Sequence, residues 1–138
     1  MFEWSGDTKK LLSLLWIFLT VNYIFCDVFT LHYAPMLQML LNGGSDSMKI
    51  TQEFLLYFAF IVEVPMIMIV LSSYLVFKLN KYANIIAALI TGAGQVFALS
   101  MGGTLHFIFF SVIEIGVAVL ILFIAISWKP KMVSQSSV

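Results

Sequence analysis

Residues 60–68 read FIVEVPMIM, which places a glutamate and a proline inside a run of large apolar side chains. A helix on the surface of a soluble protein could hold Glu63 at little cost, because water would solvate its carboxylate. A helix that crosses a lipid bilayer could hold Glu63 only if another group met the charge. The composition of the rest of the chain decides between these two settings.

The composition is that of a membrane protein. Of the 138 residues, 62% are hydrophobic and only 10% are charged, whereas a soluble domain carries about a quarter charged residues. Four apolar runs approach the roughly 20 residues that a helix needs to cross a bilayer. These runs cover approximately residues 11–31, 54–77, 82–101 and 105–128. We therefore expect an all-α, polytopic membrane protein, with one four-transmembrane-helix bundle over residues 1–138.

The lysines predict the orientation of this bundle, because cytoplasmic loops are enriched in positive charge. With four spans, one side of the membrane would hold Lys9, Lys10, Lys78, Lys81, Lys129 and Lys131, and the other side only Lys49. We expect both termini and the KLNK turn at residues 78–81 to be cytoplasmic, in a multi-pass protein of the inner or plasma membrane. The first run is longer than the apolar part of a signal peptide, and no small-x-small cleavage site follows it, so we expect a true span.

The first outer loop contains the signals of a short helix. Pro35 suits the first turn of a helix, and Gly43 and Gly44 suit its end. We expect this short helix to lie at the outer interface of the membrane, followed by a flexible surface turn at GGSDS, residues 43–47. The alternative is an extension of the first span that is kinked at Pro35.

Each apolar run carries one stripe of polar or small side chains at the 3- and 4-residue spacing of a helix face. The stripes are Trp16, Thr20, Tyr23, Asp27 and Thr30; Gln52, Leu56, Ala59, Glu63, Met66 and Val70; Asn84, Ala88, Thr91, Gln95, Ala98 and Gly102; and Phe107, Ser111, Glu114 and Ala118. Because lipid would surround the bundle, we expect all four stripes to face its interior. Glu63 and Glu114 would then lie near the midplane of the membrane.

The stripes predict a polar cavity that opens to the outer side and is closed below by aliphatic side chains. The candidate ligand-binding residues are Glu63, Glu114, Asp27, Tyr23, Gln95, Asn22 and His106. Two carboxyls in a low dielectric would not both ionise without a cation. Glu63 and Glu114 would therefore share a proton or bind a small cation or a protonated ligand, with the carbonyl of Ile61, freed by Pro65, as a further oxygen. Alternatively, Pro65 only kinks the helix, and Glu63 is protonated and hydrogen-bonded to a neighbour.

Other kinds of site have less support in the sequence. A metal site would use His106 with the two glutamates, and a haem would use His32 and His106, but the Glu-x-x-His spacing of di-iron bundles is absent. No catalytic motif and no phosphate-binding loop is present, so a membrane-embedded enzyme is only a third interpretation, and the sequence leaves any cofactor unknown. The zero net charge gives no basic footprint for nucleic acid.

A ridge of small residues runs along the third span. It consists of Gly92, Gly94, Ala98 and Gly102. Such a ridge lets helices approach closely, within a subunit or between subunits. We therefore expect the third span to be the most enclosed helix of the bundle.

Several stretches of the chain resemble a family of small bacterial four-helix membrane proteins that is catalogued as a domain of unknown function. These stretches are LLWIFLTVNYIFCDVFTLHYAPMLQMLL, FLLYFAFIVEVPMIMIVLS, KLNKYANIIAALI and FIFFSVIEIGVAVLILFIAISW, within residues 11–128. The resemblance implies the four-span fold and supplies no activity.

Two functions of different classes remain open. The bundle could bind or transport a small cation, a proton or a lipophilic ligand, for which a chain of this size would need to form a homo-oligomer. The alternative is a structural or regulatory membrane protein whose polar stripes only pack helices.

Overall fold

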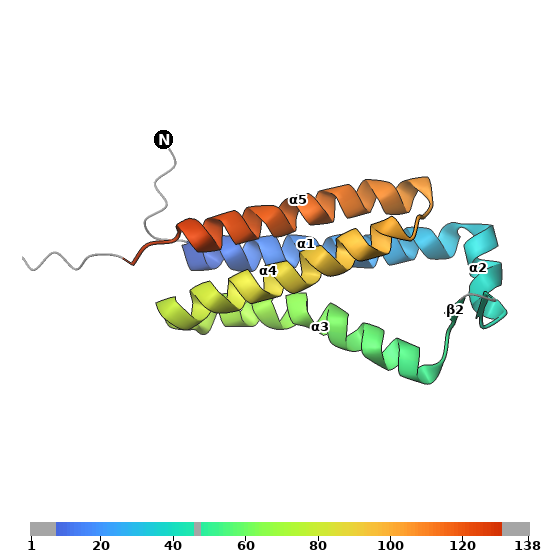
Figure 1. Cartoon of the computed structure of the whole chain (residues 1–138), viewed down its shortest axis with the longest axis horizontal. Coiled ribbons are helices and arrows are strands. Elements are labelled where there is room, and N and C mark those ends of the chain that lie inside the picture. The colour runs from blue at the N-terminus through green and yellow to red at the C-terminus, as the bar shows by residue number, and fades with distance from the viewer. Residues whose placement is uncertain (1–7, 46–47, 131–138) are drawn as a thin grey trace, which may run out of the picture.

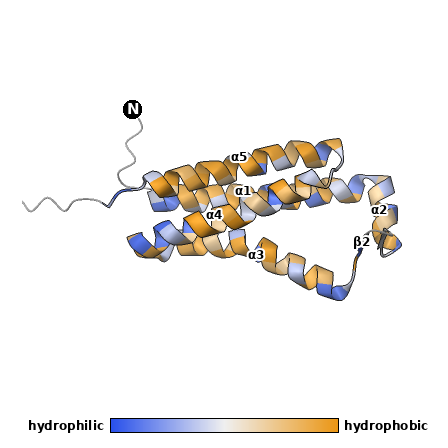
Figure 2. Cartoon of the chain, in the orientation of Figure 1, coloured by the Kyte–Doolittle hydropathy of each residue, from blue (hydrophilic) through white to orange (hydrophobic). Residues whose placement is uncertain are grey.

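The structure, a computed structural model, describes residues 8–45 and 48–130. Four of its helices are long and apolar enough to cross a membrane: α1 (Thr8–His32), α3 (Gln52–Tyr74), α4 (Phe77–Ser100) and α5 (Leu105–Ser127). They run up and down in turn and form one bundle (Figure 1). Apolar residues cover nearly the whole length of these helices (Figure 2), as expected for helices with lipid around them. The expectation of a four-helix membrane fold is confirmed.

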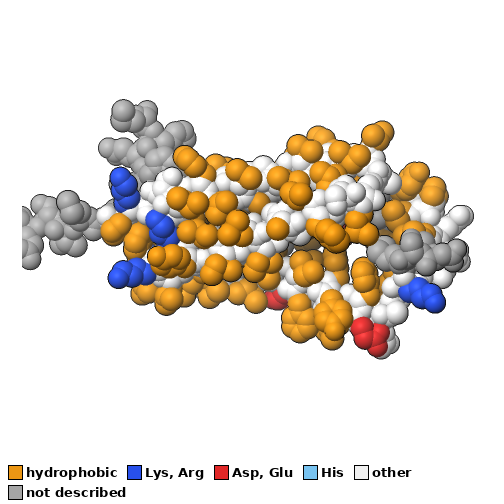
Figure 3. Space-filling model, in the orientation of Figure 1, with side chains coloured by type: hydrophobic (Ala, Val, Ile, Leu, Met, Phe, Trp, Pro, Cys, Tyr) orange, Lys and Arg blue, Asp and Glu red, His pale blue; other side chains and the backbone are white. Residues whose placement is uncertain are grey.

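The two ends of the bundle differ in charge. Lys9 and Lys10 at the start of α1, Lys78 and Lys81 at the start of α4, and Lys129 after α5 all lie at one end, which we call the lysine end. Basic side chains gather at this end in Figure 3. The opposite end, where α2 (Ala34–Leu41) lies, we call the α2 end. Lys81 also ties two helices together, because its ammonium donates to the backbone carbonyl oxygens of Ile126 (2.7 Å) and Trp128 (3.0 Å).

The connection between α1 and α3 begins with the short helix that the sequence predicts. Pro35 lies in the first turn of α2, and Gly43 and Gly44 follow the helix with φ angles of 79° and 108°, which favour glycine. An antiparallel pair of two-residue strands comes next, β1 (Gly44–Ser45) and β2 (Met48–Lys49). Strands this short show no alternating pattern, so the sequence suggested only a flexible turn there.

The connection between α3 and α4 is shorter than we expected. The KLNK segment, predicted as a turn, belongs to the first turns of α4, and only Leu75 and Val76 separate the two helices. Hydropathy marks where a helix leaves the hydrocarbon and not where the helix ends, so the polar first turns of α4 were misread. Asn80 closes the connection, because its side-chain amide donates to the carbonyl oxygens of Ser72 (2.6 Å) and Leu75 (3.4 Å).

The apolar core lies toward the lysine end. There α1 packs against α3 and α5, and α4 packs against α5 and α3. The buried hydrophobic cluster consists of Leu12, Trp16, Leu19, Met68, Ala87, Ala88, Ile121 and Ile124. Toward the α2 end, by contrast, every residue of α3 from Gln52 to Ile61 is exposed, and this half of α3 stands apart from the other helices (Figure 1).

Three of the four stripes face the interior over at least part of their length. In α1, Trp16 and Thr20 are buried and Tyr23 is half-buried, but Asp27, nearer the α2 end, is exposed. In α4, Asn84, Ala88 and Thr91 are buried, and in α5 so are Ser111, Glu114 and Ala118.

The predicted stripe of α3 faces outward, so its expected direction was wrong. All of its members, from Gln52 to Val70, are exposed, and the buried residues of α3 are instead Pro65, Met68 and Ser72. Because successive residues are about 100° apart on a helix, Glu63 and Pro65 point in nearly opposite directions. Packing of Pro65 and Met68 on the core sets the rotation of α3, and it leaves the carboxylate outside.

The most enclosed span is α1 and not α4. In the apolar window of α1, 33% of the residues are buried, against 22% in α4 and 11% in α3. A Cβ atom added at Gly92 would lie 3.4 Å from the Cβ atom of Ala118, whereas one added at Gly94 would meet nothing within 4 Å. Only part of the small-residue ridge therefore lies against another helix of the chain.

Candidate functional site

The side chain of Glu114 is the most unusual buried group of the bundle. Glu114 lies on the buried face of α5, between Ser111 and Ala118, and it is 1% exposed. Neither of its carboxyl oxygens has a hydrogen-bond partner among the residues that the structure describes. An unpaired buried carboxylate is strongly destabilising, so this group needs a proton, a cation or water to satisfy it.

Three side chains of α1 lie within electrostatic range of this carboxyl. Asp27 lies close enough to Glu114 for their two negative charges to repel one another. The hydroxyl of Tyr23 and the thiol of Cys26 also lie within the electrostatic reach of Glu114. Residues 23, 26 and 27 share one face of α1, because they are three and four positions apart. We call Glu114, Asp27 and Tyr23 the Glu114 site.

Two predicted site residues lie near the Glu114 site without contacting its carboxyl by a hydrogen bond. The amide of Gln95 donates to the hydroxyl of Ser111 at 2.8 Å, and Ser111 lies one turn from Glu114 on α5. The side-chain oxygen of Asn22 is buried and has no hydrogen-bond partner among the described residues. Asn22 and Glu114 are thus the two side chains of the described bundle with buried, unpartnered polar atoms.

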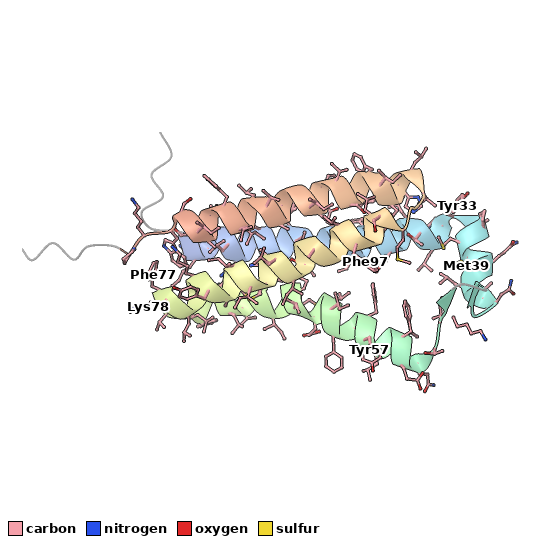
Figure 4. The ribbon with its side chains drawn as sticks, in the orientation of Figure 1. Tyr33, Met39, Tyr57, Phe77, Lys78 and Phe97 are labelled. Carbon is pink, nitrogen blue, oxygen red and sulfur yellow. The ribbon has the colours of Figure 1, made fainter. Side chains whose placement is uncertain are left out.

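His106 lies farther toward the α2 end, at the start of α5. Its ring nitrogens are 3.0 Å from the hydroxyl of Thr104, and Nε2 is 3.3 Å from the hydroxyl of Thr30 on α1. The rings of Phe29 and Tyr33 flank it, with centroids at 6.5 and 6.3 Å. Tyr33 marks this corner of the bundle in Figure 4. His106 therefore joins the ends of α1 and α5.

Glu63 does not belong to this group of residues. Its side chain is exposed on the outer surface of α3, so the expectation that Glu63 lies in the interior beside Glu114 is wrong. The electrostatic partner of Glu114 is Asp27 of α1. The sequence placed both glutamates at similar depth, but depth does not determine the rotation of a helix about its own axis.

The residues that could hold a metal or a haem are not clustered. No group of three His, Cys, Asp or Glu side chains within residues 8–45 and 48–130 is arranged to hold a metal ion. His32 is exposed, and its Nδ1 donates to the carbonyl oxygen of Val28 at 2.7 Å.

A polar network near the lysine end was missed by the sequence reading. The side-chain oxygen of Asn84 accepts hydrogen bonds from the indole of Trp16 (2.7 Å) and the hydroxyl of Ser72 (3.1 Å). Its amide donates to the side-chain oxygen (2.6 Å) and the backbone carbonyl (2.9 Å) of Asn80. We call Trp16, Ser72, Asn80 and Asn84 the asparagine network; all four are buried. The sequence feature that could have indicated this network is the pair Asn80 and Asn84, which are four residues apart and so lie on one helix face. We had assigned Asn80 to a turn and only Asn84 to the span.

Comparison with known proteins places the chain by family alone. Comparison with curated proteins and with solved structures finds no match. Residues 1–135 match the family model described as "Family of unknown function (DUF6326)". Because this match covers nearly the whole sequence, the chain belongs to the DUF6326 family, a family of unknown function.

Proposed function

We propose that this multi-pass membrane protein binds a positively charged ligand, at its simplest a proton or a small cation, at the Glu114 site. The observation that carries the proposal is the burial of Glu114 with both carboxyl oxygens unpartnered among the described residues. Asp27 adds a second negative charge nearby, which makes a positive ligand more favourable and a bare pair of carboxylates less so.

The surroundings of the site favour a small or partly apolar cation over a tightly chelated metal ion. The two carboxyls and the phenol of Tyr23 offer few hard ligands. One turn from Glu114, Phe110 packs against Phe29 of α1 with ring centroids 5.7 Å apart. Aromatic faces attract organic cations, so a protonated lipophilic amine also fits this chemistry.

A structural or regulatory role is the second candidate, and the asparagine network favours it. Every polar side chain of that network is hydrogen-bonded, which is how membrane helices are held together. The network accounts for helix packing near the lysine end. It leaves the unpartnered carboxyl of Glu114 without a role.

The binding proposal is tested with purified protein in detergent. Thermal unfolding would be followed for the wild type while Na⁺, Ca²⁺ or tetraphenylphosphonium is added, and while the pH is changed from 8 to 5. A cation present at about 100 times its Kd should stabilise the fold by about 2.7 kcal/mol. Glu114→Gln keeps the size of the side chain but removes the charge, so it should abolish the response to that cation.

Glu63→Gln is the matched control, because Glu63 is also near the middle of a span but is exposed. Its transition should shift on addition of the cation as the wild-type transition does; the pH response is not compared for this variant, because Glu63 is itself titratable. The proposal would be overturned if no cation and no pH change shifted the wild-type transition, or if Glu114→Gln responded in full.

We further propose that both termini face the cytoplasm, because five of the six lysines that the structure describes lie at one end of the bundle. Single cysteines at Gln52, near the α2 end, and at Lys78, near the lysine end, would be introduced in a Cys26→Ser background. An impermeant thiol reagent added to intact cells should label Gln52→Cys, and Lys78→Cys only after permeabilisation. The reverse pattern would contradict this orientation.

A further inference from the structure

The outward face of α3 carries an ordered stripe of residues that the rest of the described chain leaves exposed. Its members, the α3 stripe, are Gln52, Leu56, Ala59, Glu63, Met66 and Val70, and each is exposed. They are spaced by four and three residues in alternation, which is the spacing of a seam between two helices that pack side by side. Of the four spans, α3 is also the least buried within its own chain. The pattern of a helix interface is therefore present on α3 without a partner helix.

Glu63 is the central residue of this stripe, and its carboxyl is the reason to expect that another helix covers the stripe. It lies in the middle of α3, where the helix would cross the centre of the bilayer. A carboxyl that faces hydrocarbon at this depth is unfavourable. It cannot turn into the bundle, because Pro65, on nearly the opposite side of the helix, is the residue that packs inward.

We propose that two copies of this chain pack through their α3 stripes about a two-fold axis, so that Glu63 faces Glu63 of the partner subunit. A two-fold axis in the bundle direction places identical residues at identical depth. When both carboxyls are protonated, the hydroxyl of each donates to the carbonyl oxygen of its twin, and no charge remains in the hydrocarbon. Ala59, one turn away, has little bulk and lets the two helices approach closely.

A second copy accounts for Glu63 better than a different partner would. An oppositely charged residue at mid-membrane is rare, and within residues 8–45 and 48–130 each lysine lies at or near the end of a helix or outside the helices. Self-association needs no such residue. It also covers the stripe residues Leu56 and Ala59 in the half of α3 toward the α2 end, which are exposed. The inference does not depend on what binds at Glu114.

Cysteine cross-linking in native membranes tests the proposal. Ala59→Cys and, separately, Leu56→Cys would be made in the Cys26→Ser background and oxidised with copper phenanthroline. Ile61→Cys is the matched control, since Ile61 is exposed at the same level but points away from the α3 stripe. Chains with two tags of different length would be co-expressed to identify the partner.

We expect a covalent dimer from at least one of the two stripe variants, at a yield at least fivefold above that of Ile61→Cys, with a mixed-tag band. Equal yields from all three positions, or no dimer from either stripe variant, would overturn the proposal. So would a cross-linked product whose mass shows a different protein and no second tag. Glu63→Leu would also be combined with Ala59→Cys. If this variant gave the same yield of cross-linked dimer as Ala59→Cys alone, Glu63 would not face its twin.

Discussion

Asn84 and Glu114 are both almost completely buried, and both lie on faces that the sequence pattern points inward, yet their side chains are partnered very differently. The oxygen and the amide of Asn84 make hydrogen bonds to three other side chains. Glu114, on the neighbouring helix α5, makes none among the described residues. A buried polar group that is fully bonded holds helices together, whereas one that is left open is available to a ligand. The comparison separates a packing role from a binding role within one small bundle.

The largest expected effect belongs to the asparagine network. Asn84→Ala leaves the indole of Trp16 and the side-chain oxygen of Asn80 without their partner and creates a cavity between α1 and α4. We expect a loss of about 2–3 kcal/mol in the free energy of unfolding, measured by reversible unfolding in mixed micelles. Asn42→Ala, at an exposed asparagine after α2, is the control and should change stability little. If the two variants were equally stable, the network would not be what holds the helices together.

A smaller effect is expected where Gly92 of α4 faces Ala118 of α5, one turn from Glu114 along α5. Gly92→Leu would push a side chain into Ala118, and overpacking of this kind costs about 1–3 kcal/mol. Gly94→Leu, two residues away, meets open space and should not be destabilising. The melting temperatures of the two variants test whether the Glu114 site rests on tight α4–α5 packing. Equal loss at both positions would show that Gly94 is also covered, as in an oligomer that uses this face.

The smallest change in stability, and one of opposite sign, is expected at Glu114 itself. Glu114→Gln removes a charge that has no hydrogen-bond partner among the described residues and that is repelled by Asp27. We expect the ligand-free protein to gain up to about 1 kcal/mol at pH 8, in the same unfolding assay. A loss as large as that of Asn84→Ala would mean that Glu114 has a structural partner, and the contrast between the two residues would fail.

The fold could be predicted from the sequence in more detail than the site. Length and hydropathy determine four spans, and Pro35 with Gly43 marks α2, because each signal acts within a few residues. The stripes of α4 and α5 face inward over most of their length as predicted, except at Gly102, which is exposed beyond the end of α4, since a single polar face on a helix inside a bundle turns inward. The predicted direction of the α3 stripe was wrong. Glu63 and Pro65 lie on nearly opposite sides of the helix, so only one of them can face the interior, and the packing of Pro65 and Met68 on the other helices determines which one does.

The sequence alone could not show which residues contact the buried polar side chains, because these contacts join distant parts of the chain. Glu114 was identified from its position in a span, but its neighbour is Asp27 and not Glu63. The asparagine network joins residues up to 68 positions apart, and nothing in the pattern of Trp16 or Ser72 indicates that they meet. Asn80 was missed for a different reason, because lysines on both sides made its segment look like a surface turn.

The two-residue connection between α3 and α4 has a consequence for how the protein is made. Asn80 holds Ser72 and Leu75 by contacts that are local in the chain, so they need no distant segment to be present. Local contacts form early, and we expect α3 and α4 to enter the bilayer as one preformed helical hairpin. The order of synthesis then places α1 in the membrane first and α5 last, and Glu114 becomes enclosed only when the final helix closes against a scaffold that is already assembled.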